Sequence, residues 1–192
     1  HMMELKSWYI FYTTPRSEKK AYNTLVSSGY KVYLPLKQEI HYWKNRQKKL
    51  ISTPLFPNYI FVWTSQSYIY KVLQLPKIVR YISCSSVPST ISSEEIALIR
   101  NMLESDNSLS LERNNISGKK ARIISGPFSG KVGILYERKG SKRLLIQIRN
   151  IPFNLSIEVE VDHVRILTSA WSSEWVLSDL QINIPLGSSQ VN

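Results

Sequence analysis

The sequence predicts an α+β domain, with an antiparallel sheet covered by helices, followed by a small β-barrel. Of the 11 tyrosines, 10 lie at or before position 81, whereas 5 of the 7 glycines lie between positions 118 and 140. The first part mixes β-favouring runs with helical spacings, and the second has only short runs between glycine turns. We therefore predict one domain over 1–105, a polar linker over 106–116, a barrel over 117–168 and a tail of undefined structure over 169–192.

The first domain is predicted to follow the order β-α-β-β-β-α-β-α. Residues 8–12 form an apolar, β-favouring run that predicts a buried strand. Residues 15–28 predict an amphipathic helix, which Gly29 is placed to end. The apolar residues of this helix lie one turn apart or side by side: Ala21, Tyr22, Leu25 and Val26.

The rest of the first domain alternates short strands with two more helices. The last helix begins at Ser92, because a serine followed three residues later by Glu95 forms a capping box. Its apolar stripe comprises Ile96, Ile99 and Leu103. The elements before it are a strand over 30–35, two arms over 37–53 around a polar tip at 44–49, a strand over 58–63, a helix over 65–75 ended by Pro76, and a strand over 78–83.

Five short runs predict the strands of the second domain. A barrel suits them, because closing a small sheet hides its edges. These runs cover 121–124, 132–136, 143–148, 156–161 and 164–167.

The chain is strongly basic, with a net charge of +11 and a pI near 9.7. Such a charge favours polyanion partners, because each neutralised phosphate releases condensed counterions. The alternative is that the charge only maintains solubility. A single cysteine excludes an internal disulfide, and no run approaches the ~20 apolar residues of a membrane span. We expect a cytoplasmic protein with no membrane partner.

The titratable residues do not suggest catalysis. The histidines at 1, 41 and 163 are scattered, and no His, Cys and carboxylate cluster has the spacing of metal ligands. No glycine-rich phosphate loop follows a strand and opens a helix. We expect no enzyme, no cofactor and no metal, with a nuclease of dispersed carboxylates as the alternative.

A glycine-rich turn in the second domain provides one of two recognisable patterns. Gly126 permits a tight turn before Pro127, and Phe128 can plug the end of the barrel. Gly130 and Gly133 allow close approach of the backbone between strands. Residues 118–133 resemble the KOW motif, the core of a small barrel in NusG proteins and some ribosomal proteins.

The second pattern lies in the first domain. Residues 54–62 resemble the F-P-x-Y-φ-φ-V signature of the N-terminal (NGN) domain of NusG proteins, where φ is apolar. Trp8-Tyr9, Glu18-Lys19-Lys20, Pro35 and residues 76–82 follow in the family's order. Over about residues 7–168 the chain resembles NusG-like transcription elongation factors, and its finer resemblance is to specialised antiterminators of the UpxY and RfaH type. A housekeeping NusG and a ribosome-associated RNA-binding protein are the alternatives.

This resemblance implies that the first domain docks on the clamp helices of the largest RNA polymerase subunit and touches the opposite wall of the DNA cleft. Such a factor suppresses pausing or termination by binding one polymerase conformation better than another. The implied clamp-helix contacts are Tyr12, Phe56, Pro57, Asn58, Tyr59 and Phe61. The alternative is that several of these are core residues, because one face of the strand must be buried. Ser67, Tyr68 and Lys71 would face the opposite wall. The resemblance also implies a monomer.

Basic residues of the first domain could approach non-template DNA or nascent RNA. Neighbouring aromatic rings offer faces for base stacking, whereas the alternative is a solvated basic hairpin without a ligand. The predicted nucleic-acid residues are Arg16, Lys19, Lys20, Tyr42, Trp43, Lys44, Arg46, Lys48 and Lys49. The resemblance also implies that the barrel recruits a ribosomal protein or the termination factor Rho, and its basic residues make RNA a further option. In specialised antiterminators of the RfaH type, this module can refold as a helical hairpin. The glycines and β-branched residues of the present chain favour the barrel, so we do not expect such a switch.

Overall fold

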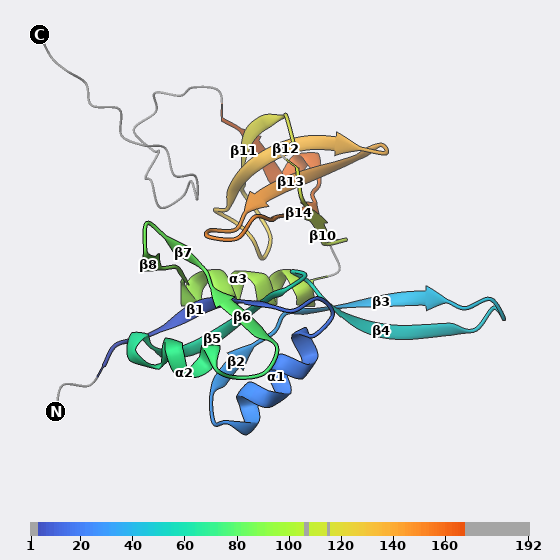
Figure 1. Cartoon of the computed structure of the whole chain (residues 1–192). Coiled ribbons are helices and arrows are strands. Elements are labelled where there is room, and N and C mark those ends of the chain that lie inside the picture. The colour runs from blue at the N-terminus through green and yellow to red at the C-terminus, as the bar shows by residue number, and fades with distance from the viewer. Residues whose placement is uncertain (1–3, 106–107, 115, 168–192) are drawn as a thin grey trace, which may run out of the picture. The chain divides into compact units, whose positions relative to one another are not determined.

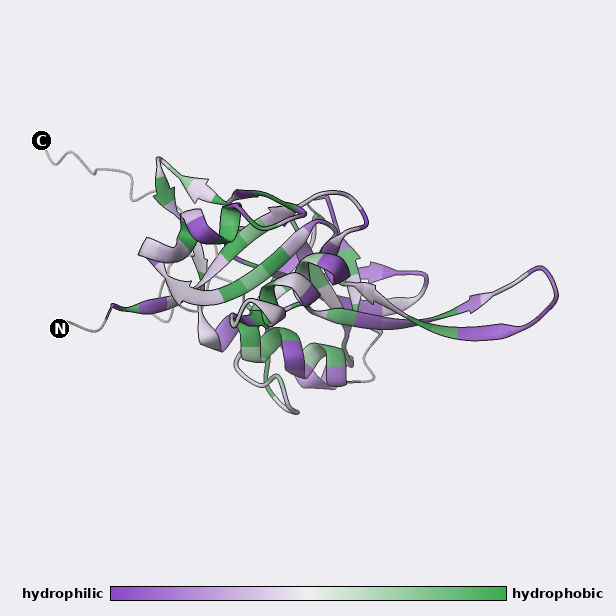
Figure 2. Ribbon diagram, turned by 60° about the horizontal axis from the view of Figure 1, so that its bottom comes forward, coloured by the Kyte–Doolittle hydropathy of each residue, from purple (hydrophilic) through white to green (hydrophobic). Residues whose placement is uncertain are grey.

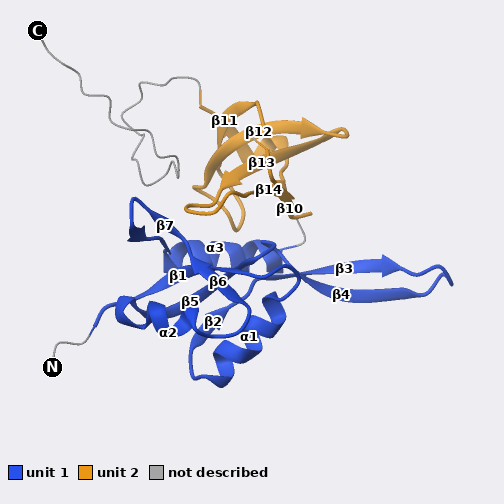
Figure 3. Ribbon diagram, viewed as in Figure 1, with its two compact units in different colours: residues 1–106 blue, residues 107–192 orange. Residues whose placement is uncertain are grey.

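The computed structural model describes residues 4–105, 108–114 and 116–167. Two compact units divide the chain, residues 1–106 and 107–192 (Figure 3). The predicted tail over 169–192 lies outside the described residues. No helix formed by the described residues has the length and apolar character needed to span a bilayer.

The first unit contains a five-stranded antiparallel sheet with helices on both faces (Figure 1), which confirms the predicted α+β class. The strand order is β2-β5-β1-β6, and β9 pairs with β1 at one end. The sheet strands are β1 (Lys6–Thr13), β2 (Lys31–Tyr33), β5 (Tyr59–Ser65), β6 (Ile78–Tyr81) and β9 (Thr90–Ile91). The helices are α1 (Glu18–Ser27), the 3-10 turn η1 (Gln66–Tyr68), α2 (Ile69–Leu73) and α3 (Ser93–Glu104).

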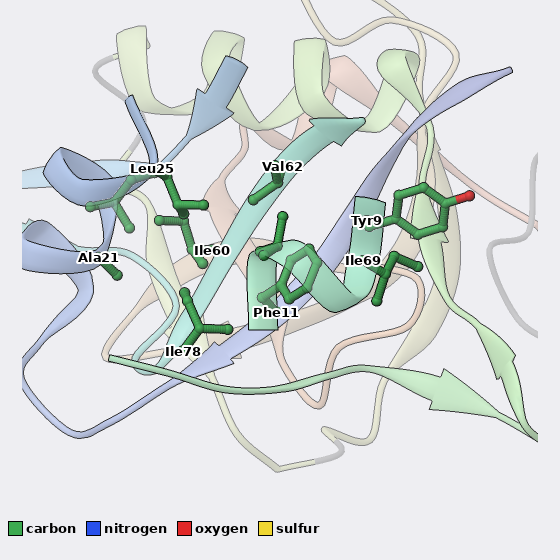
Figure 4. Close-up of a cluster of buried hydrophobic side chains, with 10 residues drawn as sticks. Tyr9, Phe11, Ala21, Leu25, Ile60, Val62, Ile69 and Ile78 are labelled. Carbon is green, nitrogen blue, oxygen red and sulfur yellow. The ribbon is translucent and has the colours of Figure 1, made fainter. Parts of the chain in front are cut away.

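One face of this sheet forms a core with α1 and α2. Because side chains alternate along a strand, every second residue of the two central strands points to this face. Figure 4 shows Tyr9 and Phe11 of β1 beside Ile60 and Val62 of β5. Leu25 of α1 and Ile69 of α2 pack against them.

Helix α1 buries a narrower stripe than its apolar residues suggest. Ala21 and Leu25 are fully buried, but Tyr22 and Val26 are 37% and 46% exposed. The four residues cover more of the helix circumference than the sheet can contact, so the Tyr22 and Val26 pair points outward. Gly29 follows the helix with φ +88°, as expected of a residue that ends it.

Helix α3 covers the other face of the sheet. The Ser92 hydroxyl accepts the Glu95 backbone N–H at 3.1 Å, which confirms the predicted start. Ile96 and Ile99 are buried as predicted, whereas Leu103 is only half-buried because Met102 takes the inward position. The buried stripe also contains Leu98. The Arg100 guanidinium lies 4.6 Å from the Tyr33 ring centre, which places α3 over β2.

Two hairpins leave the sheet. The larger consists of β3 (Leu36–Tyr42) and β4 (Lys48–Pro54), with His41 opposite Lys49, and agrees with the predicted arms. It extends away from the sheet and ends in a hydrophilic tip (Figure 2). The smaller, β7 (Ser83–Cys84) with β8 (Val87–Pro88), was not expected from the sequence.

The second unit is a curled six-stranded antiparallel sheet with the order β10-β14-β13-β12-β11-β15. All five predicted strands are present. Within the described residues, β10 and β15 are the two edge strands of this sheet. We had expected closure into a barrel to hide both edges, and in this respect the sheet differs from the prediction. The strands are β10 (Ser110–Glu112), β11 (Lys119–Ile123), β12 (Val132–Arg138), β13 (Ser141–Gln147), β14 (Asn154–Glu158) and β15 (Val164–Ile166), the last after a 3-10 turn η2 (Val161–His163).

Strand β10 lies inside the segment expected to be a linker. Ser110 pairs with Ser156 and Leu111 with Leu155 of β14. The segment is polar and has little periodicity, so its sequence does not predict a strand. Pairing with β14 and the polar contacts of Glu112 hold it in place. The Glu112 carboxylate accepts from Ser156 at 3.0 Å and pairs with Arg138 at 2.7 Å.

Candidate binding surfaces

The predicted clamp-helix residues meet on the face of the sheet that α3 partly covers. Register pairs Tyr12 of β1 with Tyr59 of β5 and with Arg80 of β6. The two tyrosine rings meet edge to face at 5.4 Å, and the Arg80 guanidinium lies 4.7 Å from the Tyr12 ring centre. Tyr12 is half-buried and Arg80 is exposed. Burial raises the pKa of Tyr59, although the Arg80 charge opposes the shift.

Phe56 and Phe61 are core residues and present no surface to a partner. Both are fully buried, and their rings meet edge to face at 6.2 Å. Phe61 lies on the same face of the sheet as Tyr59 but nearer its centre, opposite Ile10. Phe56 precedes β5 and packs on Phe61.

Asn58 has a structural role in the turn before β5. Its φ is +71°, in the left-handed region that asparagine tolerates better than most residues. Its amide Nδ2 donates to the Thr13 carbonyl at 3.1 Å, and its backbone N–H donates to Glu18 Oε1 at 2.9 Å. Pro57 and Asn58 remain half-buried, so both also contribute to the surface.

Tyr59, predicted as a contact, is only 8% exposed, because it packs against Tyr12 at the edge of the core. We define the Tyr12 surface as Tyr12, Pro57, Asn58 and Arg80, with Tyr59 as the residue that supports Tyr12. The sequence did not single out Arg80 as a member of this surface. It also did not reveal that the Glu18 carboxylate holds the Asn58 turn by accepting its backbone N–H. The available signal for Arg80 was its place in the segment 76–82 that resembles the family. Its contact with Tyr12 depends on the pairing of β6 with β1, which the sequence does not specify.

The predicted second contact forms a compact group at η1 and α2. The Lys71 ammonium lies 4.6 Å from the Tyr68 ring centre. The Ser67 hydroxyl donates to Glu4 Oε2 at 2.6 Å, and this hydrogen bond lowers the pKa of Glu4. Tyr70, which the sequence did not single out, is 69% exposed beside them. An exposed aromatic and cationic group is therefore available here.

The predicted basic residues divide into two sets. Arg16, Lys19 and Lys20 line a groove of about 460 Å³ at the base of the large hairpin. Its opposite wall consists of Thr53, Pro54 and Pro57, and Glu18 also lines it. The Lys19 ammonium donates to the Ser52 carbonyl, so this side chain ties α1 to β4. The groove thus borders the Tyr12 surface through Pro57.

The second set surrounds the tip of the hairpin. Tyr42 and Trp43 are 69% and 56% exposed, and the Lys48 ammonium lies 5.6 Å from the Tyr42 ring centre. Trp43 donates its backbone N–H to the Gln47 carbonyl at 3.0 Å, which closes the turn. Seven residues of β3 span about 20 Å, so the tip reaches well beyond the sheet. The remaining tip cations are exposed: Lys44, Arg46 and Lys49.

The glycine-rich turn of the second unit has the expected form, with one difference. Gly126 and Gly130 have φ +91° and +92°, and Phe128 between them is buried. The Gly130 N–H donates to the Ile123 carbonyl at 2.7 Å. A Cβ at Gly133 would overlap the Leu145 carbonyl oxygen, whereas one at Gly130 would meet nothing. Position 130 therefore favours glycine because of its positive φ, and not because another strand approaches it closely. Pro127 is exposed.

The described residues contain no group of three or more His, Cys, Asp or Glu side chains that could hold a metal ion. The exposed Cys84 is a free thiol.

Comparison with known proteins points to one family. Residues 6–100 match the family model described as transcription termination factor nusG. The chain is NusG-like. It is 24% identical over 179 residues to the transcription termination/antitermination protein NusG of Helicobacter pylori strain J99, covering 86% of this chain and 97% of that protein. The Campylobacter jejuni NusG is 27% identical over 173 residues, covering 83% and 95%.

A solved structure supports the same fold. The structure titled "Domain interaction in Thermotoga maritima NusG" aligns with a TM-score of 0.53 at 20% identity. The alignment covers 85% of this chain and 98% of that one. The chain thus shares the fold of a NusG over both units, and it is a NusG-like protein whose curated relatives carry transcription termination/antitermination names.

Proposed function

We propose that this NusG-like chain is a transcription elongation factor that binds the clamp helices of RNA polymerase through the Tyr12 surface and suppresses pausing or termination. The observation that carries the proposal is the Tyr12, Tyr59 and Arg80 cluster. In this cluster a half-buried Tyr12 and an exposed Arg80 are braced by the buried Tyr59, and tyrosine and arginine are among the residue types that contribute most to protein interfaces. Ser67, Tyr68 and Lys71 form the second contact, toward the opposite wall of the cleft.

The proposed activity requires only binding to polymerase, and this protein carries out no chemical step. A factor that binds the elongating conformation better than the paused one shifts the population toward elongation. We further propose that the factor is specialised for particular operons, such as capsular polysaccharide clusters, and is recruited by non-template DNA or nascent RNA. The exposed Tyr42 and Trp43 beside four tip cations support this part, because they combine stacking faces with positive charge.

Single-round transcription with bacterial RNA polymerase tests the docking surface. Tyr12→Ala and Arg80→Ala should abolish pause suppression and terminator read-through while leaving the fold intact. Tyr22→Ala is the matched control, since Tyr22 is 37% exposed on α1, on the opposite side of the sheet. A wild-type protein without effect on any template, or equal loss in the control, would refute the proposal.

Template dependence separates a specialised factor from a housekeeping NusG. Several promoters are compared with and without their native leader sequences. The specialised role requires that activity depends on the leader and is lost when Lys44, Arg46, Lys48 and Lys49 are all replaced by glutamine. Equal activity on all templates, unchanged by these substitutions, would assign the housekeeping role.

A further inference from the structure

Strand β15 is an edge of the second unit's sheet, and one side of its backbone is open. Within the described residues it pairs with β11 alone. The Ile124 N–H donates to the His163 carbonyl at 2.8 Å across these strands. Hydrogen-bonded pairs alternate with non-bonded pairs in an antiparallel ladder, so the N–H and C=O groups of Val164 and Ile166 point away from β11. In the part of the chain that the structure describes, these groups have no partner.

The side chains of Val164 and Ile166 face the interior of the unit but are incompletely covered. Val164 lies opposite Ile123, and Ile166 lies opposite Ala121. Directly opposite residues share one face of a sheet, and Ile123 and Ala121 are 4% and 0% exposed, so this face is the interior one. Ile166 is nevertheless 43% exposed, and Val164 is only half-buried. The apolar interior therefore ends at an uncovered edge.

The exposed aliphatic side chains of the described second unit all lie at this edge. They are Ile124, Val161 and Ile166, which are 43%, 64% and 43% exposed. Val161 belongs to η2, directly before β15, and Ile124 is held to His163 by the hydrogen bond between the two strands. An open backbone edge with apolar side chains is a site where a further strand can pair.

The sequence after β15 contains one segment that suits this edge. Residues 180–186, which lie outside the described residues, read Leu-Gln-Ile-Asn-Ile-Pro-Leu. Their apolar residues alternate strictly with Gln181, Asn183 and Pro185, and this alternation is typical of a strand with one buried face. Residues 168–179 precede the segment, and they are long enough to let it return beside β15, whose three residues span about 10 Å.

We propose that residues 180–186 add to β15 as an antiparallel strand and cover its exposed interior face. In an antiparallel ladder, the residues that exchange hydrogen bonds carry their side chains on the same face. The partners of Val164 and Ile166 must therefore have side chains that face the interior, and the apolar positions of the segment provide them. The same parity turns the backbone of Pro185, which has no N–H, toward solvent, where an edge strand tolerates proline.

Amide hydrogen exchange of the full chain, followed by NMR spectroscopy, tests this pairing. In the wild type the Val164 and Ile166 amides should exchange slowly, because they donate to the added strand. The double variant Ile182→Asn with Ile184→Asn removes the apolar face of the segment, and it should accelerate both exchanges about tenfold or more. Arg165 provides an internal control in the same spectra, since its amide faces β11 and should stay protected.

A matched variant alters the other face of the same segment. Gln181→Ser with Asn183→Ser keeps the apolar positions, so the Val164 and Ile166 amides should stay protected. The proposal fails if these amides exchange rapidly in the wild type. It also fails if they exchange equally slowly in the wild type and in Ile182→Asn with Ile184→Asn.

Sedimentation at several protein concentrations identifies the source of the strand. Protection that stays constant in a monomer supports pairing within one chain. Protection that rises with concentration as a dimer forms would mean that a second copy supplies the strand, and it would overturn the proposal. The measurements contain no polymerase or nucleic acid, so their result is independent of the transcription experiments.

Discussion

The Tyr12 ring meets the Tyr59 ring edge to face at 5.4 Å, at the border between core and surface. Tyr12 is half-buried, whereas Phe61, on the same face, has no exposed area. This difference separates residues that can contact a partner from those that hold the surface in place.

The first prediction contrasts these two positions. Phe61→Ala should lower the free energy of unfolding by about 3–5 kcal/mol, because it leaves a cavity in the core. Tyr12→Ala should cost only about 1 kcal/mol, as expected for a partly exposed residue. Urea unfolding followed by circular dichroism measures both. Similar costs would mean that Tyr12 is as much a core residue as Phe61, and its loss of function could then not be assigned to docking.

The turn at Asn58 yields the second prediction. Asn58→Ala should destabilise the first unit by about 2 kcal/mol, since it loses the hydrogen bond to the Thr13 carbonyl and places alanine at positive φ. Asn58→Gly should cost about 1 kcal/mol less, because glycine adopts this φ freely. Chemical denaturation of the three proteins gives the order. A glycine variant less stable than the alanine variant would contradict it.

The third prediction concerns two glycines of the second unit. Gly133→Ala should destabilise severely, because its Cβ would overlap the Leu145 carbonyl oxygen on the neighbouring strand. Gly130→Ala should cost only about 1–2 kcal/mol, since the space around it is open and only its φ of +92° is unfavourable. Thermal unfolding of both variants distinguishes steric from conformational cost, and equal midpoints would count against this distinction.

The fourth prediction is a pH dependence of the attachment of β10. The hydrogen bond from Arg138, followed by that from Ser156, holds the pKa of Glu112 below its ordinary value of 4.5. A carboxyl with a depressed folded-state pKa stabilises the fold above the unfolded-state pKa, and this contribution disappears as the pH falls through the folded-state pKa. Acidification below about pH 4.5 should therefore weaken the second unit.

Glu112→Gln tests this dependence. At pH 6 the variant should be less stable by about 1–3 kcal/mol, because charge-assisted hydrogen bonds are lost. Between pH 6 and pH 3 the wild type should lose more stability than the variant. Glu137→Gln is the control, since Glu137 pairs with Lys142 at 3.1 Å but is 57% exposed. Parallel pH profiles of wild type and Glu112→Gln would disprove the role of this carboxylate.

Local patterns in the sequence determined most of the secondary structure. Alternating or β-branched runs predicted the sheet strands, Ser92 with Glu95 predicted the start of α3, and Gly29 and Gly126 marked their turns, because these signals depend on neighbouring residues only. The family resemblance rested on similarly local segments.

Tertiary structure decided which of the resembling residues are exposed. Phe56 and Tyr12 are both aromatic and belong to the same predicted surface, yet Phe56 is core because it packs on the buried Phe61, whereas Tyr12 lies at the end of β1 and stays half-buried. The pairing of Arg122 with Arg165, and that of β10 with β14, likewise depend on strand register. These pairings join residues 41 to 46 positions apart, and packing over the whole sheet sets their register, so no local pattern could reveal it.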